Sequence, residues 1–151
     1  MTIRSLVVLV IAVTAAGCRR GGPETAPDTQ TFTRSVNATT SRVVEAAMAV
    51  FAENQITVAS SDQTKGEVMT IPLDPSGQWG GVLPDERVNC AGVDTPDPNA
   101  RVILTVKARG ESGGSRLSLE AKRSGGASCV LRGTFLTQLM DAIAARSLRG
   151  A

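Results

Sequence analysis

Cysteine and carboxylate side chains are the chemically reactive groups of this chain, because it contains neither histidine nor tyrosine. The missing imidazole removes the commonest general base and the commonest zinc ligand, and the missing phenol removes another proton donor. No Ser-His-Asp, Cys-His or His-Glu-x-x-His arrangement can be built from these residues. The sequence therefore favours a protein that binds over an enzyme, and we expect no metal and no cofactor.

The nearest approach to a catalytic pair is a set of carboxylates in one long irregular stretch. Asp74 with Asp85 or Glu86 could supply the two carboxylates of glycoside hydrolysis. No apolar pocket pattern surrounds them, so we prefer the interpretation that they are solvated loop charges. A hydrolase is accordingly the last of the functions considered.

The first eighteen residues have the pattern of an export signal. Arg4 is followed by an apolar run over residues 6–13, which is too short to cross a bilayer but has the length of a signal-peptide core. The segment Ala15-Ala16-Gly17-Cys18 then resembles the lipobox of bacterial lipoproteins. This resemblance implies cleavage before Cys18 and lipidation of its thiol. An ordinary secretory peptide cleaved after Ala16 or Gly17 is the alternative.

A lipidated Cys18 implies that residues 1–17 are a signal peptide and that acyl chains anchor the mature protein in a membrane. By resemblance to lipoprotein sorting in Gram-negative bacteria, an Asp directly after the lipidated cysteine would favour retention away from the outer membrane. This chain has Arg19 at that position. We therefore expect an outer-membrane location, with the domain in the periplasm. Residues 18–30 lack apolar periodicity and are predicted to be a flexible tether. The formal net charge of +2 gives no reason to expect a nucleic-acid partner.

Two cysteines, Cys90 and Cys129, remain once Cys18 is assigned to the lipid. In an exported protein such a pair predicts a disulfide, because the compartment is oxidising. A redox or metal-binding pair is the alternative. Neither cysteine belongs to a Cys-x-x-Cys motif and no histidine could complete a metal site, so the structural disulfide is preferred.

Hydrophobic periodicity predicts a single α+β domain over residues 31–149. Residues 102–109 and 116–122 alternate apolar with polar side chains and are joined by a short loop that contains Gly113 and Gly114, as in a β-hairpin. A two-layer fold follows, with an antiparallel sheet and two helices on one face, because the polar alternate residues require an open face. The expected order is β-α-β-β-β-β-α, with strands over 31–36, from 56, over 66–71, 102–109 and 116–122, and helices over 42–54 and 134–148.

One segment, residues 73–99, shows no periodicity and is rich in proline and glycine. A loop of this length is uncommon in a compact domain, so it is either functional or held in place by Cys90. It contains the only tryptophan, Trp79. This side chain could be a partner contact, since tryptophan is enriched at binding hot spots, or it could fold back and close the core.

The order of elements around residues 32–70 resembles a known family. A helix ends in a polar break and is followed by Ile56-Thr57-Val58, Asp62 and a strand that begins at Gly66. This is similar to the repeated domain of BamC, an outer-membrane lipoprotein of the β-barrel assembly machinery, and to small lipoproteins with BamC-like domains. The chain has Asn54-Gln55 where that family often has glycine, and one such domain where BamC has two.

The resemblance implies an interaction or assembly module at the outer membrane, with other envelope proteins such as barrel-assembly components as partners. An exposed sheet face, a sheet edge or the Trp79 loop would carry the contacts. The alternative is a carrier that holds a lipid or other apolar ligand between helix and sheet, in a cavity lined by Val44, Met48 and Phe51.

Overall fold

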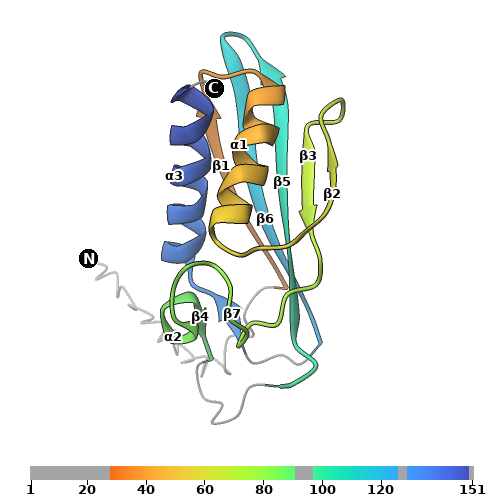
Figure 1. Cartoon of the computed structure of the whole chain (residues 1–151), viewed down its shortest axis with the longest axis vertical. Helices are drawn as coiled ribbons and strands as arrows, with labels where there is room; N and C mark the ends of the chain where they lie inside the picture. Colours follow the sequence, from red (N-terminus) through yellow and green to blue (C-terminus); the bar gives the residue numbers. More distant parts are fainter. Residues whose placement is uncertain (1–27, 91–96, 126–128, 150–151) are drawn as a thin grey trace, which may run out of the picture.

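The computed structural model describes residues 28–90, 97–125 and 129–149. Five strands form one antiparallel sheet in the order β1-β6-β5-β3-β2, and β4 pairs with β7 in a second, two-stranded sheet (Figure 1). The strands are β1 (Thr29–Val36), β2 (Val58–Asp62), β3 (Glu67–Thr70), β4 (Val88–Asn89), β5 (Arg101–Glu111), β6 (Gly114–Ser124) and β7 (Val130–Leu131). The helices are α1 (Thr40–Glu53), α2 (Pro84–Arg87) and α3 (Gly133–Arg149).

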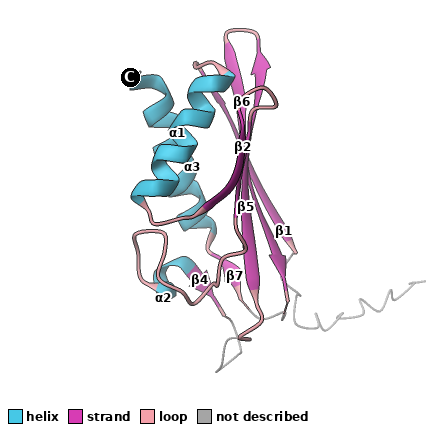
Figure 2. Cartoon of the chain, turned by 45° about the vertical axis from the view of Figure 1, so that its right-hand side comes forward, coloured by secondary structure: helices cyan, strands magenta, loops and turns pink. Residues whose placement is uncertain are grey.

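The two long helices, α1 and α3, lie side by side on one face of the five-stranded sheet and leave its other face open (Figure 2). The predicted two-layer α+β class is confirmed. The predicted order lacked α2, β4 and β7, three short elements that lie within or just after stretches without periodicity. No helix among the described residues is both long and apolar enough to cross a membrane.

The β5–β6 hairpin is the centre of the sheet and confirms the predicted alternation. Its pairing runs without a shift from Arg101 opposite Ser124 to Glu111 opposite Gly114. The side chains that face the helices are buried, and those on the open face are mostly polar and partly exposed. The completely buried core residues of the sheet and helices include Val43, Val44, Phe51, Val68, Leu104, Val106, Leu117, Leu119, Leu136 and Ile143.

Helix α1 begins at Thr40, two residues before the predicted start, and the Thr39 side chain accepts a hydrogen bond from the backbone N–H of Arg42 at 3.4 Å. It ends at Asn54, and the next residue, Gln55, has a φ of +56°. Gln55 is the one non-glycine residue with positive φ in the described part of the chain. Glycine adopts this left-handed conformation without the steric cost that a side chain carries.

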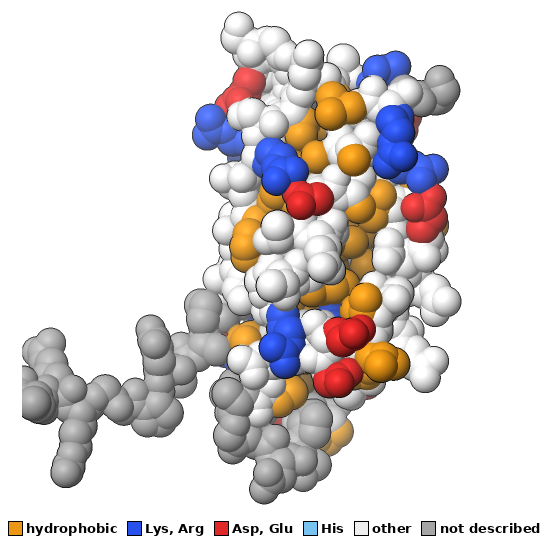
Figure 3. Space-filling view, turned by 90° about the vertical axis from the view of Figure 1, so that its left-hand side faces the viewer, with side chains coloured by type: hydrophobic (Ala, Val, Ile, Leu, Met, Phe, Trp, Pro, Cys, Tyr) orange, Lys and Arg blue, Asp and Glu red, His pale blue; other side chains and the backbone are white. Residues whose placement is uncertain are grey.

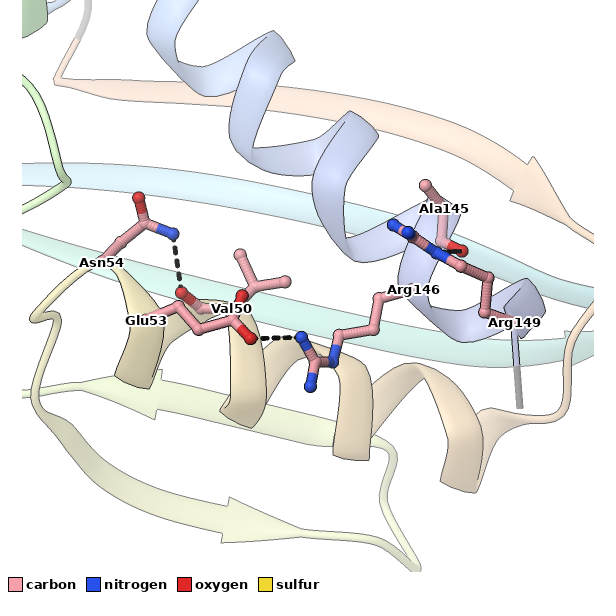
Figure 4. A network of polar contacts seen from close by, with 6 residues as sticks. All are labelled: Val50, Glu53, Asn54, Ala145, Arg146 and Arg149. Carbon is pink, nitrogen blue, oxygen red and sulfur yellow. Dashed lines mark hydrogen bonds and ion pairs between the residues drawn. The ribbon is translucent and has the colours of Figure 1, made fainter. Parts of the chain in front are cut away.

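The two helices are joined across their solvent side near the end of α1. Glu53 of α1 forms an ion pair with Arg146 of α3, and the Asn54 side chain donates to the carbonyl oxygen of Val50 at 2.8 Å (Figure 4). These contacts close the last turn of α1 against α3.

Strand β1 begins two residues before the strand predicted over residues 31–36. It pairs with β6 along its whole length, from Thr29 opposite Lys122 onward, so Thr29 and Gln30 belong to the sheet. Arg123 extends this pairing, because its backbone N–H donates to Asp28 at 2.8 Å and its side chain forms an ion pair with the same residue. The predicted signal peptide and Cys18 lie outside the described residues.

Gly66, directly before β3, cannot carry a side chain without strain. Its φ is +67°, and a Cβ atom there would lie 2.2 Å from the carbonyl oxygen of Ala108. The backbone N–H of Ala108 in turn donates to Gly66 at 2.7 Å. This close approach is what brings β3 against β5.

Replacing Gln55 with glycine should stabilise the domain by about 1 kcal/mol, because a side chain in the left-handed conformation carries a steric cost that glycine avoids. Urea unfolding followed by circular dichroism measures the effect. Gln63→Gly is the matched control, because Gln63 lies in an exposed turn and its φ is not positive. This change should be neutral or slightly destabilising. Equal effects of the two changes would contradict the explanation.

Candidate functional site

Most of the segment for which the sequence predicts an irregular loop forms a cap over one end of the helix layer. We name it the α2 cap and define it as residues 73–90 and 129–132. Figure 1 shows α2, β4 and β7 grouped below the ends of α1 and α3. Leu73 attaches the cap to the main sheet through a pair of backbone hydrogen bonds with Val102, of 2.8 and 2.9 Å.

A single buried cation, Arg87, organises the interior of the cap. Its side chain is completely buried. One terminal nitrogen, Nη1, donates to the carbonyl oxygens of Trp79 and Val82, and Nη2 donates to those of Pro75 at 3.0 Å and Gly77 at 2.5 Å. Four backbone carbonyls from different parts of the loop therefore converge on one guanidinium group, whose planar fork suits several acceptors at once.

Trp79 belongs to the same buried cluster. The guanidinium carbon of Arg87 lies 4.1 Å from the centre of the Trp79 ring, a cation–π contact. The indole Nε1 donates to the carbonyl oxygen of Asp74 at 2.5 Å, and Phe135 packs edge-on with ring centres 5.9 Å apart. Only 6% of Trp79 is exposed. Of the two interpretations that the sequence left open, this burial agrees with the one in which Trp79 closes the core.

Burial and charge both act on the ionisable groups of the cap. Desolvation lowers the pKa of Arg87, and the negative charge of Asp74 opposes part of that shift. The pKa of Asp74 is itself lowered, chiefly by the hydrogen bond from the Ser76 hydroxyl at 2.7 Å, and further by the Ser76 backbone N–H and the positive charges of Arg101 and Arg87. Asp74 therefore remains a carboxylate that orders the turn and partly compensates the buried cation.

The predicted disulfide is present and joins the two strands of the small sheet. Cys90 and Cys129, whose Cα atoms are 4.2 Å apart, follow β4 and precede β7. Arg132 reinforces this sheet, because its Nε donates to the carbonyl oxygens of Asp85 at 2.9 Å and Val88 at 3.1 Å. The expectation that Cys90 holds the long loop in place is thus met for the described part of that loop.

Two backbone contacts fix the cap to the helix layer. The N–H of Gly80 donates to the carbonyl oxygen of Asn54, at the end of α1, at 2.5 Å. Gly80 has a φ of +82°, and a Cβ atom on it would lie 2.9 Å from the ring of Phe135 on α3. Glycine is needed here, because both the backbone conformation and the close approach exclude a side chain.

The surface of the cap has two hollows, one on each side of α2. The first has a volume of about 330 Å³ and is walled by Pro75, Ser76, Pro84, Asp85, Val88, Cys90, Cys129 and Arg132. The second has a volume of about 420 Å³ and is walled by Gln55, Gln78, Trp79, Gly81, Val82, Leu83, Pro84 and Glu86. Pro84 belongs to both walls, and Leu83, which is 64% exposed, belongs to the wall of the second hollow. Leu83 forms an apolar ridge there, and this ridge with the two hollows is the candidate binding site.

The face on which α3 lies also exposes apolar surface. Figure 3 shows a strip of hydrophobic side chains along it, flanked by basic and acidic groups. At the far end from the cap, Leu148 is 55% exposed. Below the strip, a smaller hollow of about 130 Å³ lies where the cap meets α3.

Two of the three carboxylates considered for hydrolysis have structural roles. Asp74 accepts from Ser76, and Glu86 accepts from the backbone N–H of Leu83 at 3.3 Å, which fixes the start of α2. The residues 28–90, 97–125 and 129–149 contain no cluster of three potential metal ligands. The predicted carrier cavity is filled at two of its three positions, because Val44 and Phe51 are completely buried in the core.

Comparison with known proteins yields likeness of fold only. No protein-family model matches the chain, and no curated protein does. Among solved structures, the chain is similar to Ara h 8.0201, with 8% identity, a TM-score of 0.45, and coverage of 81% of this chain and 98% of that one. It is also similar to an uncharacterized protein from Rhizobium leguminosarum, with 15% identity, a TM-score of 0.41, and coverage of 81% and 95%. Protein CV1439 from Chromobacterium violaceum gives 17% identity, a TM-score of 0.41, and coverage of 80% and 96%. Likenesses this distant carry no argument about ligand or partner.

Replacing Arg87 with methionine should destabilise the domain by about 3–5 kcal/mol, because it leaves buried carbonyl oxygens without donors. Urea unfolding measures the loss, and near-ultraviolet circular dichroism of Trp79 reports whether the cap keeps its packing. Arg42→Met is the matched control, since Arg42 is exposed on α1, and should change stability by less than about 0.5 kcal/mol. Arg87→Lys should fall between the two. A tolerated Arg87→Met would contradict the role given to this residue.

Proposed function

We propose that this protein is a lipid-anchored, non-enzymatic domain of the bacterial cell envelope that binds other envelope components at the outer membrane. Lipidation at Cys18, in the segment Ala15-Ala16-Gly17-Cys18, would hold it at the periplasmic face. The resemblance to BamC around residues 32–70 supports an interaction or assembly role, with barrel-assembly components as the first partners to test.

The observation that carries this proposal is the disulfide between Cys90 and Cys129. Disulfides persist in exported proteins and are rare in the reducing cytosol. The disulfide therefore supports export independently of the first eighteen residues. It also accounts for both cysteines that a lipidated Cys18 leaves over.

The described surface supports binding through two features. The α2 cap presents two hollows, and the exposed ridge of Leu83 forms part of the wall of one of them. β1 is an eight-residue edge strand whose pairing with β6 has no irregularity, whereas the other edge strand, β2, has a register shift between Val58 and Ser60. A regular edge strand can accept a further strand, and a bulged one is protected from this.

The test combines lipid labelling with recovery of partners. Cells that produce the wild-type chain or Cys18→Ser are grown with labelled palmitate, cross-linked mildly, and extracted with detergent before affinity purification. The wild type should carry the label and bring barrel-assembly components with it, and Cys18→Ser should lose the label because the thiol that accepts the lipid is absent. A wild-type chain without lipid would refute the anchor, and a lipidated chain recovered alone would refute the assembly role.

A carrier of an apolar ligand is the second candidate, and the hollow beside the disulfide favours it. Its volume of about 330 Å³ is within the range of small-molecule sites, roughly 300–1,000 Å³. Pro75, Pro84, Val88 and the disulfide provide apolar walls, and Arg132 provides a cation at the rim. The ligand would thus lie at the end of the domain and not between helix and sheet.

Asp85→Trp should fill this hollow, because Asp85 is exposed and forms part of its wall. Organic extraction of the folded protein followed by mass spectrometry should recover an apolar molecule from the wild type and much less from Asp85→Trp. Thr137→Trp, exposed on α3 outside the hollow, is the control and should behave as the wild type. Extracts of wild-type protein that contain no bound molecule would count against a carrier.

A further inference from the structure

We infer that the α2 cap is the membrane-facing end of the domain, and that Leu83 enters the interface of the bilayer in which Cys18 is anchored. This inference rests on the lipid anchor of the proposed function. It adds an orientation and a contact surface that the anchor alone does not specify.

The first step is where the tether joins the domain. β1 starts at Thr29, and its neighbour Gln30 lines the same narrow crevice as Pro75, Val88 and Cys129 of the cap. Figures 1 and 2 show the start of β1, α2, β4 and β7 at the end of the molecule opposite to the β5–β6 turn. The chain that leads to Cys18 therefore enters the domain at the α2 end.

The second step is the length of that chain. Residues 19–27 separate Cys18 from Asp28, which the backbone and side chain of Arg123 hold beside β6, and nine residues span at most about 32 Å when fully extended. The 11-residue strand β5 is about 36 Å long. Even at its greatest reach this segment is shorter than the sheet, which places the α2 end, and not the β5–β6 turn, next to the membrane.

The third step is the ridge itself. Leu83 is the most exposed of the large hydrophobic residues in the described chain, at 64%. Its backbone is fixed, because its carbonyl oxygen accepts from the N–H groups of Glu86 at 3.1 Å and Arg87 at 3.2 Å. Arg87 also binds the carbonyl oxygen of the preceding Val82 at 3.2 Å. The backbone at Leu83 is therefore held in place, and its exposed side chain is available for contact with an apolar phase.

The charges around the ridge indicate what kind of contact this is. Exposed Asp85 and Glu86 follow Leu83 on α2, and exposed Arg132 lies beside Asp85, because its Nε donates to the Asp85 carbonyl oxygen at 2.9 Å. Because acidic groups are present beside the basic one, attraction to anionic lipid does not drive the contact. The partner is the apolar interface of a bilayer, and the contact should persist in vesicles without net charge and at high salt.

The experiment compares two exposed leucines at opposite ends of the domain. The full lipidated chain is prepared as Leu83→Cys or Leu148→Cys, each labelled with bimane, and reconstituted in phosphatidylcholine vesicles that contain a nitroxide lipid. Leu148, 55% exposed near the end of α3, is the matched control. Quenching should be strong at position 83, weak at position 148, and unchanged by salt. Mass spectrometry of the same samples measures acylation of Cys18.

A second pair of variants avoids the label. In vesicles, Leu83→Asp should raise amide hydrogen exchange in residues 82–87 relative to the wild type, and Leu148→Asp should not. Equal quenching at the two positions, or stronger quenching at 148, in an acylated protein would overturn the orientation and leave the proposed function standing. A chain without the acyl mass would overturn both. Protection of position 83 that needs added envelope protein would replace the bilayer with a protein partner and overturn the inference.

Discussion

A buried guanidinium group determines the shape of the α2 cap. Apolar side chains of the cap join the main hydrophobic core, and most of the cap's backbone lies outside regular structure. Carbonyl oxygens in such a loop must find donors or remain hydrated. Arg87 supplies donors to four of them while its flat face covers Trp79. The position of Trp79, the exposure of Leu83 and the two hollows all depend on this one side chain.

Periodicity in the sequence was enough to predict the elements that form the two layers. β5, β6, α1 and α3 each extend over two or more repeats of their hydrophobic pattern, so the pattern is strong. β4 and β7 have two residues each and cannot show a period. α2 did have a local signal, because Pro84 begins it and Asp85 and Glu86 occupy its first turn. That signal was hidden by the proline and glycine around it.

The candidate site was predictable in part. Counting cysteines identified the disulfide, and the scarcity of aromatic residues favoured Trp79 as a core residue. Arg87 was missed because a lone arginine in a loop resembles any solvated charge. Its role depends on carbonyl groups of residues 75–82, which approach it only after the loop has folded. The position of a cavity could not be predicted from the sequence either, because Val44 and Phe51 have the same apolar character whether they line a cavity or fill a core.

The pairing of β4 with β7 gives the chain a nested architecture. Val88 lies opposite Leu131, Arg101 lies opposite Ser124, and Glu111 lies opposite Gly114. The two strands of the small sheet therefore flank the β5–β6 hairpin in the sequence, one before it and one after it. Strands arranged in this way can pair in order, first β5 with β6 from the Glu111–Gly114 turn outward and then β4 with β7. Each pairing shortens the loop that the next pairing must close. The disulfide between Cys90 and Cys129 lies next to the β4–β7 pair. Once formed, it makes the two central strands of the sheet part of a covalent ring, which keeps them near one another even when the rest of the domain is unfolded.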